Sequence, residues 1–412
     1  MPARLLLTPK GVILGLAGLA LAGLATLDAA VAALTPVAPK AAAGRPGGTS
    51  ARITLLDRKL VANLLAPLPR NTRQVARAAL RVEPLDPVAL HLLAFSADPK
   101  GQSARAVEFA RLANRVTRRD LLSQLILIDH AARSGQAGRA LDHYDAALRA
   151  HPSSRPVVFP ILKKALASPS IRRDLAPYFV SRAPWARDFT FFAIDDRQAV
   201  RLVSEVVIQA GPMMGRQDLA FGSPPILTRL IEARAFAEVS ALLRLVPGGD
   251  PRLLQQAEWT AASTDPAFGL AAWQLASTAT SSATFVLRDG VRVLSVYAAS
   301  GGNAVVASKV LALSPGTYAL RQEMELAETG SGARAAGERR AQWRVVCLSA
   351  DNNATIWQGR DFLSVPGRQI HNDIIIPESC PHQRLDLVVQ ASFDAPALDL
   401  SLSNFKLTRA SQ

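Results

Sequence analysis

The chain has 412 residues and a formal net charge of +14, with 49% hydrophobic and 19% charged residues. That length exceeds one ordinary hydrophobic core and predicts two folded domains. The positive charge lies in residues 1–252, which hold 34 Lys and Arg against 19 Asp and Glu, whereas residues 253–412 hold 13 against 14. Aromatic residues are sparse in the basic region and no DNA- or RNA-binding motif occurs, so nucleic acid is excluded as a partner.

Residues 1–34 predict an export signal. Arg4 and Lys10 precede an apolar stretch over residues 11–34 that only Asp28 interrupts. Its length approaches the roughly 20 residues that span a bilayer, which favours an uncleaved anchor in the bacterial inner membrane with the rest of the chain in the periplasm. The sequence Ala30-Val31-Ala32 leaves signal cleavage open, which would give a soluble periplasmic or secreted protein. Residues 35–51 are rich in Pro, Gly and Ala and predict a flexible linker.

Residues 52–250 predict a helical repeat domain. Pro84 and Pro152 lie two periods of 34 residues apart, and each follows a stretch of alanine-spaced helix. The same offsets recur in Ala106, Ala110 and Ala113 and, 34 residues later, in Ala140, Tyr144 and Ala147. A repeat of this length indicates stacked helical hairpins, whose small residues let paired helices approach closely.

The second helix of this repeat resembles the tetratricopeptide repeat (TPR) family. Ala140, Tyr144, Ala147 and Pro152 supply its small residue, its aromatic four positions on, its next small residue and its closing proline. The resemblance implies an α-helical solenoid that binds a protein partner. The first helix matches less well, because Gln124 replaces the family's aromatic residue. An irregular bundle of amphipathic helices therefore stays open as the alternative.

The basic charge of the front half has two interpretations. A basic exported domain would be attracted to anionic lipid headgroups or acidic polymers. The arginines would also be explained as the solvated faces of helices in a chain rich in Ala and Arg, and this second interpretation is the simpler one.

Residues 253–412 predict a β-sandwich, because apolar and polar residues alternate there between turn residues. The segments are VRVLSVYA, KVLALSPGTYALRQEMELAE, QWRVVCLSA, RLDLVVQASF and LDLSLSNFKLTR. The fold class expected for the whole chain is multidomain α+β, with a TPR-like helical solenoid followed by an antiparallel β-sandwich or jelly roll. Cys347 and Cys380 are the only cysteines and predict one disulfide. Their spacing does not suit a metal site.

In outline the second half resembles the jelly-roll modules that bind carbohydrate. The resemblance rests on the number of strands, the turn Ser314-Pro315-Gly316-Thr317-Tyr318 and the closing strand Leu402–Leu407. It implies an exposed aromatic side chain with polar neighbours. The candidate glycan contacts are Trp357 with Asn352, Asn353, Arg360 and Asp361. A core position for Trp357 is the competing interpretation, since most tryptophans of small sandwiches are buried.

No sequence motif of an enzyme or of a cofactor site occurs outside the apolar segment, and we expect no catalytic residue, no metal and no cofactor. The low-ranked alternative is a glycan-active hydrolase with dispersed catalytic residues. The predicted function is an exported, membrane-anchored scaffold that binds a protein partner through its helical repeats, with residues 11–34 in the inner membrane and polysaccharide as a further ligand. The alternative is a carbohydrate-binding protein that acts through its β-sandwich.

Overall fold

The structure is a computed structural model of the whole chain, and it divides into two compact units, residues 1–162 and residues 163–412. The predicted change from helix to strand after residue 250 falls inside the second unit. The structure describes residues 29, 33–35, 37–45, 48–62, 68–98, 103–181, 183–211, 223–327, 339–348, 353–364 and 369–410.

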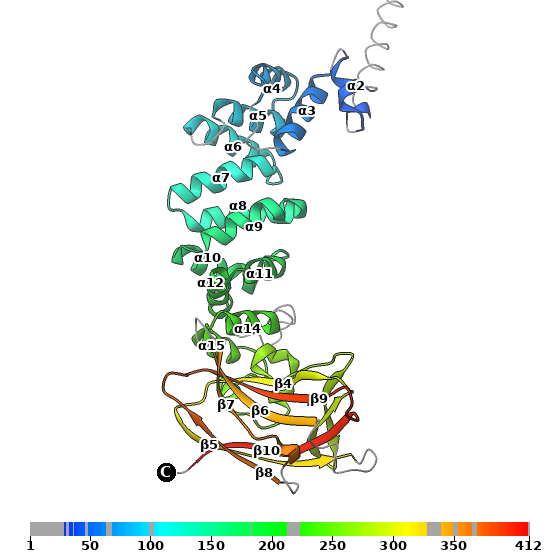
Figure 1. Cartoon of the computed structure of the whole chain (residues 1–412). Helices are drawn as coiled ribbons and strands as arrows, with labels where there is room; N and C mark the ends of the chain where they lie inside the picture. Colours follow the sequence, from blue (N-terminus) through cyan, green and yellow to red (C-terminus); the bar gives the residue numbers. More distant parts are fainter. Residues whose placement is uncertain are drawn as a thin grey trace, which may run out of the picture. The chain divides into compact units, whose positions relative to one another are not determined.

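The first unit is built from successive helices that pair into hairpins (Figure 1). Its helices are α2 (Pro39–Ala43), α3 (Thr49–Ala62), α4 (Thr72–Val82), α5 (Pro87–Ala97), α6 (Ala104–Val116), α7 (Leu121–Arg133), α8 (Ala137–Ala150) and the first part of α9 (Arg155–Ala165). Helix α5 pairs with α6, and α7 pairs with α8. Helices α5, α6 and α7 begin at Asp86, Ser103 and Asp120, whose side chains accept hydrogen bonds from backbone N–H groups of the first turn.

The repeated small residues lie at the helix contacts of these hairpins. Tyr144 is almost completely buried, and five alanines of the repeat are completely buried. They are Ala106, Ala110, Ala113, Ala140 and Ala147. Pro152 is exposed and opens the 3₁₀ turn that follows α8, where its fixed φ and missing N–H suit the first turn of a helix. Paired helices at the predicted positions are therefore shown, while the TPR identity of the repeat stays a prediction.

Gln124, the main departure from the TPR pattern, is part of a buried polar network. Its Nε2 donates to Asn114 Oδ1 and to the Arg118 carbonyl, both at 2.8 Å, and its Oε1 lies 2.7 Å from His143 Nδ1. The amide replaces an aromatic side chain without leaving a polar atom unpaired, because each of its two groups finds a partner.

Much of the stretch predicted as a flexible linker is helical in the structure. Helix α2 lies within residues 35–51, and α3 begins at Thr49. Ala42 and Ala51 are completely buried, and Arg52 Nε donates to the Ala43 carbonyl at 3.0 Å. The run Pro39–Ala43 forms a helix because alanine has the highest helix propensity and Pro39 stands in the first turn, where a proline is tolerated.

The described residues contain no helix that is long and apolar enough to cross a bilayer. The longest described helices, α3 and α8, have 14 residues each, whereas a span needs about 20. This finding contradicts the predicted location in the inner membrane. The predicted anchor itself, residues 11–34, lies outside the described residues except for Ala29, Ala33 and Leu34.

The second unit joins further helices to a β-sandwich. The helices are α10 (Pro169–Val180), α11 (Ala186–Ile194), α12 (Arg197–Gln209), α14 (Ser223–Glu232) and α15 (Phe236–Leu243), followed by the 3₁₀ turns η2 (Pro251–Leu254), η3 (Ala262–Thr264) and η4 (Pro266–Ala271). Helices α10 and α12 pack together, and α14 packs against η4. A tight turn at Arg234, which has a φ of +59°, separates α14 from α15.

The strands are β1 (Gln274–Leu275), β2 (Ser281–Arg288), β3 (Val291–Ala298), β4 (Asn303–Leu311), β5 (Gly316–Leu326), β6 (Arg339–Leu348), β7 (Asn353–Gln358), β8 (Gln369–Ile376), β9 (Gln383–Ala391) and β10 (Leu398–Arg409). They form two antiparallel five-stranded sheets (Figure 1). We call sheet A the order β1-β4-β9-β6-β7 and sheet B the order β2-β3-β10-β5-β8.

The strand pairing is that of a jelly roll. Strand β3 pairs with β10, β4 with β9, β5 with β8 and β6 with β7, so the eight strands form nested antiparallel pairs that alternate between the two sheets. Two interlocked Greek keys of this kind define the jelly roll. The predicted architecture, helices followed by an antiparallel sandwich, is confirmed.

Aromatic rings from both sheets and from the segment before the sandwich fill its core. Trp343 and Phe405 lie 5.1 Å apart, and Trp273 contacts both rings. Trp259 stacks on Phe405 at 5.1 Å. The buried indole N–H groups of Trp343 and Trp273 donate to Gln322 Oε1 and to the Ala257 carbonyl, so these rings add apolar burial without losing hydrogen bonds.

Candidate functional site

The outward side of sheet B, which we call the outer face, is a mostly polar surface. Leu400 and Leu402 on β10 and Leu294 and Val296 on β3 point into the core, so the residues that alternate with them point outward. The residues of the outer face include Ser282, Thr284, Ser295, Tyr297, Arg321, Glu323, Glu325, His371, Asp373, Asp399, Ser401, Ser403 and Lys406, and the apolar Val286, Val291, Val293 and Ile375 lie on the same side away from Tyr297.

Tyr297 is the aromatic residue of this outer face. Its side chain is 44% exposed, and the register places it opposite Asp399 on β10 and Ser282 on β2. The next row along the strands brings Ser295, Ser401 and Glu325 together. Cross-strand neighbours lie about 5 Å apart, so the Tyr297 ring has a carboxylate and hydroxyl groups at its sides.

A β-bulge in β10 shapes the middle of the outer face. The register between β10 and β5 shifts between Ser403 and Lys406, and Asn404 adopts a φ of +52°, a conformation that asparagine tolerates better than most residues. Asn404 Nδ2 donates to Glu323 Oε2 at 2.8 Å. The bulge therefore holds an amide beside a carboxylate on an exposed strand.

A second exposed aromatic residue stands at the end of the sandwich where β3 finishes and β10 begins. Phe393 is 86% exposed, and a Cβ added to Gly301 would lie 2.5 Å from its ring. Gly301 has a φ of +77° and donates its N–H to the Ser392 carbonyl. Because Tyr297 is near the end of β3 and Asp399 near the start of β10, the Phe393 loop borders the Tyr297 end of the outer face.

The outward side of sheet A differs at its centre, where a buried carboxylate is paired with two arginines. Asp386 on β9 alternates with the core residues Leu385 and Leu387, yet it is completely buried. Its carboxylate accepts from Arg384 Nε at 2.7 Å and from Arg344 Nη2 at 2.9 Å. A carboxylate engaged in this way is part of the fold and is not offered to a ligand.

The four predicted glycan contacts that the structure describes do not form an exposed platform around Trp357. Trp357 lies opposite Val345 on the inward side of the edge strand β7, half buried and packed against the core. Asp361 Oδ1 accepts from the backbone N–H groups of Ala341 and Leu363, and Arg360 is exposed. Asn353 is exposed and pairs with a helix residue, as described next, and Asn352 lies outside the described residues.

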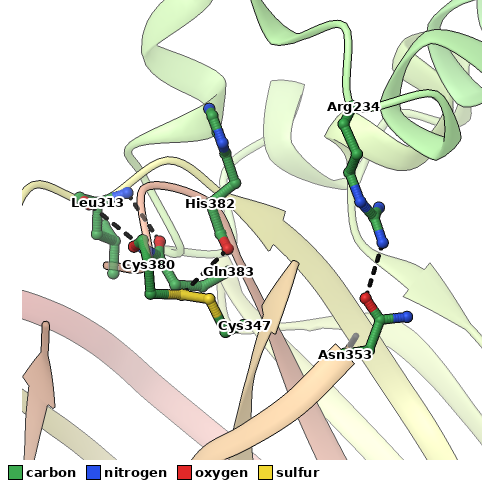
Figure 2. The surroundings of a disulfide bond; sticks show 7 residues. All are labelled: Arg234, Leu313, Cys347, Asn353, Cys380, His382 and Gln383. Atoms are coloured by element: carbon green, nitrogen blue, oxygen red, sulfur yellow. Dashed lines mark hydrogen bonds between the residues drawn. A yellow bond between two sulfur atoms is a disulfide. The ribbon is translucent and has the colours of Figure 1, made fainter. Parts of the chain in front are cut away.

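The neighbourhood of the disulfide connects the helices of the second unit to sheet A (Figure 2). The predicted bond between Cys347 and Cys380 is formed. Arg234 Nη2 donates to Asn353 Oδ1 at 2.8 Å, as Figure 2 shows. The Phe236 ring stacks on His382 with centroids 3.6 Å apart. Burial and the positive charge of Arg234 lower the pKa of His382, which keeps its ring neutral at pH 7.

Among the described residues, no group of three His, Cys, Asp or Glu side chains is arranged to hold a metal ion. The His371–Asp373 pair on the outer face has its nearest atoms 3.5 Å apart and both side chains more than half exposed. Such a pair is a weak surface contact.

Tyr297 and Phe393 were not among the predicted contacts, although the sequence carries a signal for Tyr297. In the segment VRVLSVYA, Leu294, Val296 and Ala298 share one face, so Ser295 and Tyr297 must share the other. A tyrosine on the polar face of a strand whose other face is buried is expected to have an exposed ring. No such signal exists for Phe393, which lies in a loop.

Comparison with known proteins finds similarity to solved structures only. No protein family and no curated protein matches the chain. A CBM4 module shares 10% identity over 34% of this chain and 86% of that one, with a TM-score of 0.22. The CBM22-1–GH10 modules of Clostridium thermocellum xylanase 10B share 15% sequence identity over 34% of this chain and 26% of that one, with a TM-score of 0.25. A carbohydrate-binding module of the β-sandwich superfamily shares 13% sequence identity over 33% of this chain and 57% of that one, with a TM-score of 0.24. The jelly-roll fold of this chain is assigned from its own strand order and does not rest on these similarities.

Proposed function

We propose that the β-sandwich binds carbohydrate on its outer face, at the end that holds Tyr297. The observation that carries the proposal is an exposed tyrosine ring directly opposite a carboxylate, Asp399, on the outward side of the sheet. A pyranose ring presents apolar C–H groups on its faces and hydroxyl groups at its rim. An aromatic ring takes the first, and carboxylate, hydroxyl and amide groups take the second.

The polar groups around Tyr297 fit this role. Asp399, Glu325 and Ser401 lie on strands that hydrogen bonding holds in register, so a sugar would meet side chains on a rigid scaffold. Phe393 offers a second ring at the border of the same surface, which suits a chain of sugars more than a single one. The disulfide supports a working place in an oxidising compartment, where carbohydrate polymers are found.

Affinity electrophoresis on a panel of neutral polysaccharides tests the proposal. We expect Tyr297→Ala to reduce retention about tenfold, since an aromatic contact contributes roughly 1 kcal/mol beyond its buried area. Phe393→Ala should give a smaller loss. Ile375→Ala is the matched control, because Ile375 is an exposed apolar residue on β8 of the same sheet, away from Tyr297.

Two results would contradict the proposal. One is unchanged retention of both aromatic variants, and the other is an equal loss in Ile375→Ala. Trp357→Ala belongs in the same series, as the contact predicted from sequence. If Trp357→Ala alone abolished retention while unfolding at the wild-type denaturant concentration, the binding surface would lie at the β7 edge.

A second candidate function, recognition of a protein by the helical hairpins, is favoured by one observation. A small groove of about 150 Å³ in the first unit is lined mainly by apolar side chains, among them Val61, Leu125 and Val157. Val61 and Val157 are both about half exposed. If the groove binds a partner, Val157→Asp should reduce the set of neighbours captured by crosslinking, and Val116→Asp, outside the groove, should leave that set unchanged.

A further inference from the structure

Helix α4 carries an unusual row of arginines. Arg73, Arg77 and Arg81 follow one another at intervals of four residues, and Arg70 stands just before the helix. All four are exposed, and with Gln74 and Ala78 they line a surface groove of about 440 Å³. Residues spaced by four lie on one side of a helix about 6 Å apart, so the guanidinium groups form a stripe. We call these four residues the arginine stripe.

The arginine stripe has no counter-charge in the part of the chain that the structure describes. No described carboxylate lies within 4.0 Å of any of the four guanidinium groups. Arg73 Nη2 donates to the Ser96 carbonyl at 2.9 Å, which anchors one side chain to the end of α5. The first unit holds 21 Lys and Arg residues against 10 Asp and Glu, so its overall field is positive as well.

The acidic residues of the elements that pack on α4 are occupied elsewhere. Asp57 on α3 lies 3.1 Å from His91 Nε2. Asp86 caps α5 through the Val88 and Ala89 N–H groups. Asp98 accepts from the Ser103 N–H at 2.7 Å. Glu83, the C-cap of α4, lies two residues after Arg81 without forming an ion pair with the stripe among the described residues. Like charges four residues apart destabilise a helix slightly, and the helix dipole offsets part of this for Arg81 in the last turn.

We propose that the arginine stripe is a second binding site and that its ligand is an acidic polysaccharide, a sugar chain with a carboxylate on its repeating unit. Guanidinium groups bind carboxylates through two parallel hydrogen bonds, which a row of such groups can repeat. The interval of about 6 Å along the helix is close to the length of one sugar residue in an extended chain.

The lining of the groove favours a hydrophilic chain over the other polyanions. Its side chains are guanidinium groups, one amide and one methyl group. A peptide helix or a lipid surface would need large apolar side chains in the groove to bury against, and the lining supplies none. The site is separate from the outer face of the sandwich, and it takes charged glycan, whereas Tyr297 and its neighbours suit neutral sugar rings.

The test measures binding of the full chain to polygalacturonate by affinity electrophoresis and titration calorimetry. Fully methyl-esterified polygalacturonate is the neutral probe with the same backbone. The variant is Arg70→Gln, Arg77→Gln and Arg81→Gln together, which leaves Arg73 and its bond to Ser96 in place. The matched control is Arg105→Gln, Arg115→Gln and Arg118→Gln, three exposed arginines of the same unit outside the groove.

We expect the full chain to bind polygalacturonate and to lose about tenfold in affinity in the stripe variant, with little change in the control. The binding should weaken as salt is raised. Binding of the esterified probe should be unaffected by the stripe variant. The stripe substitutions should cause the same loss of polygalacturonate affinity in a chain that also carries Tyr297→Ala. The experiment therefore distinguishes a wrong assignment of the stripe from a wrong assignment of the outer-face site.

Four results would overturn the proposal. They are no binding of polygalacturonate, an equal loss in the control variant, tighter stripe-dependent binding to poly-glutamate than to polygalacturonate, and stripe-dependent binding to phosphatidylglycerol vesicles alone. The last two would assign the stripe to an acidic peptide or to a lipid surface.

Discussion

The carboxylate of Asp120 lies 2.9 Å from Nδ1 of the buried His91, whose Nε2 faces Asp57 at 3.1 Å. His91 belongs to α5, and the two carboxylates come from α7 and α3, so one imidazole joins three helices of the first unit. Burial alone would lower the pKa of His91, but the hydrogen bond to Asp120 and the negative charges of Asp120 and Asp57 outweigh it and raise the pKa to about 9. The ring is therefore charged at pH 7.

This arrangement predicts that the first unit loses stability in mild alkali. A histidine whose folded pKa is raised from 6.5 to about 9 adds stability below pH 6.5 that is lost as the pH rises through 9. The full contribution is on the order of 3 kcal/mol. Hydrogen exchange of the α5 amides should accelerate from pH 6.5 to 9 beyond the intrinsic rise. In the His91→Gln variant, exchange of these amides should be fast over the whole pH range and should increase only as the intrinsic exchange rate does. A wild-type profile that parallels His91→Gln would refute the prediction.

Lys309 predicts the opposite dependence for the second unit. Its ammonium group is buried on the inward side of β4 and donates to the Ala271 carbonyl at 2.6 Å. Burial lowers the pKa of Lys309 to about 7, and the charge of Glu258 only partly opposes this. Folding therefore favours the neutral amine, and stability should rise as the pH increases from 7 to 10.5, with the full cost present below pH 7.

Denaturation followed by tryptophan fluorescence checks this prediction, since all five tryptophans lie in the second unit. Lys309→Met should raise the free energy of unfolding at pH 6 by about 1 to 3 kcal/mol and flatten the pH dependence. Lys406→Met, on the exposed side of β10, is the control and should change little. Loss of stability in Lys309→Met would show that the hydrogen bond to Ala271 outweighs the cost of burial.

The disulfide should contribute to the stability of the second unit alone. It joins the end of β6 to the turn before β9, and the bridged residues are 33 apart in sequence. Replacing Cys347 and Cys380 together by serine should lower the free energy of unfolding by roughly 3 to 4 kcal/mol in the chain-entropy estimate. Exchange of α5 and α7 in the first unit should be unchanged. Faster exchange of α5 and α7 in the double variant would contradict this prediction.

The contact between Phe236 and His382 should couple α15 to the sandwich. A double-mutant cycle with Phe236→Ala and His382→Ala should give a coupling free energy of about 0.5 to 1.5 kcal/mol, as for other aromatic pairs. The measurement is urea denaturation at pH 8, where His382 is neutral. Additive effects of the two substitutions would show that the stacked rings contribute nothing beyond their separate burial.

Much of the sandwich was predictable, because alternation reports directly on a strand with one buried face. The segments VRVLSVYA and LDLSLSNFKLTR coincide with β3 and β10. Four strands have no predicted segment, and one of them, β1, has only two residues. In β7 the first three residues are exposed and the edge position leaves little pattern, and β8 ends in Ile374, Ile375 and Ile376, which hides the alternation. In β2 the consecutive apolar residues Phe285, Val286 and Leu287 have the same effect.

The candidate sites depend on information that no local pattern contains. Asp399 lies opposite Tyr297 only because β10 returns to pair with β3, about 100 residues later in the chain. The arginines of α4 can be recognised in the sequence. Their lack of carboxylate partners cannot, because it depends on which groups Asp57, Asp86 and Asp98 contact in the folded chain. Trp357 looked like a platform because its neighbours in sequence are polar, whereas the β7 register points it inward.

The central claim, glycan binding at the Tyr297 end of the outer face, is tested most directly by hydroxyl-radical footprinting of the wild-type chain. Oxidation of Tyr297 and Phe393 would be measured with and without a neutral polysaccharide that retains the protein. Bound glycan should lower oxidation of Tyr297 and Phe393 several-fold and leave oxidation of Ile375 and Trp357 unchanged. Unaltered oxidation of Tyr297 at saturating glycan, or protection of Trp357 in its place, would contradict the claim.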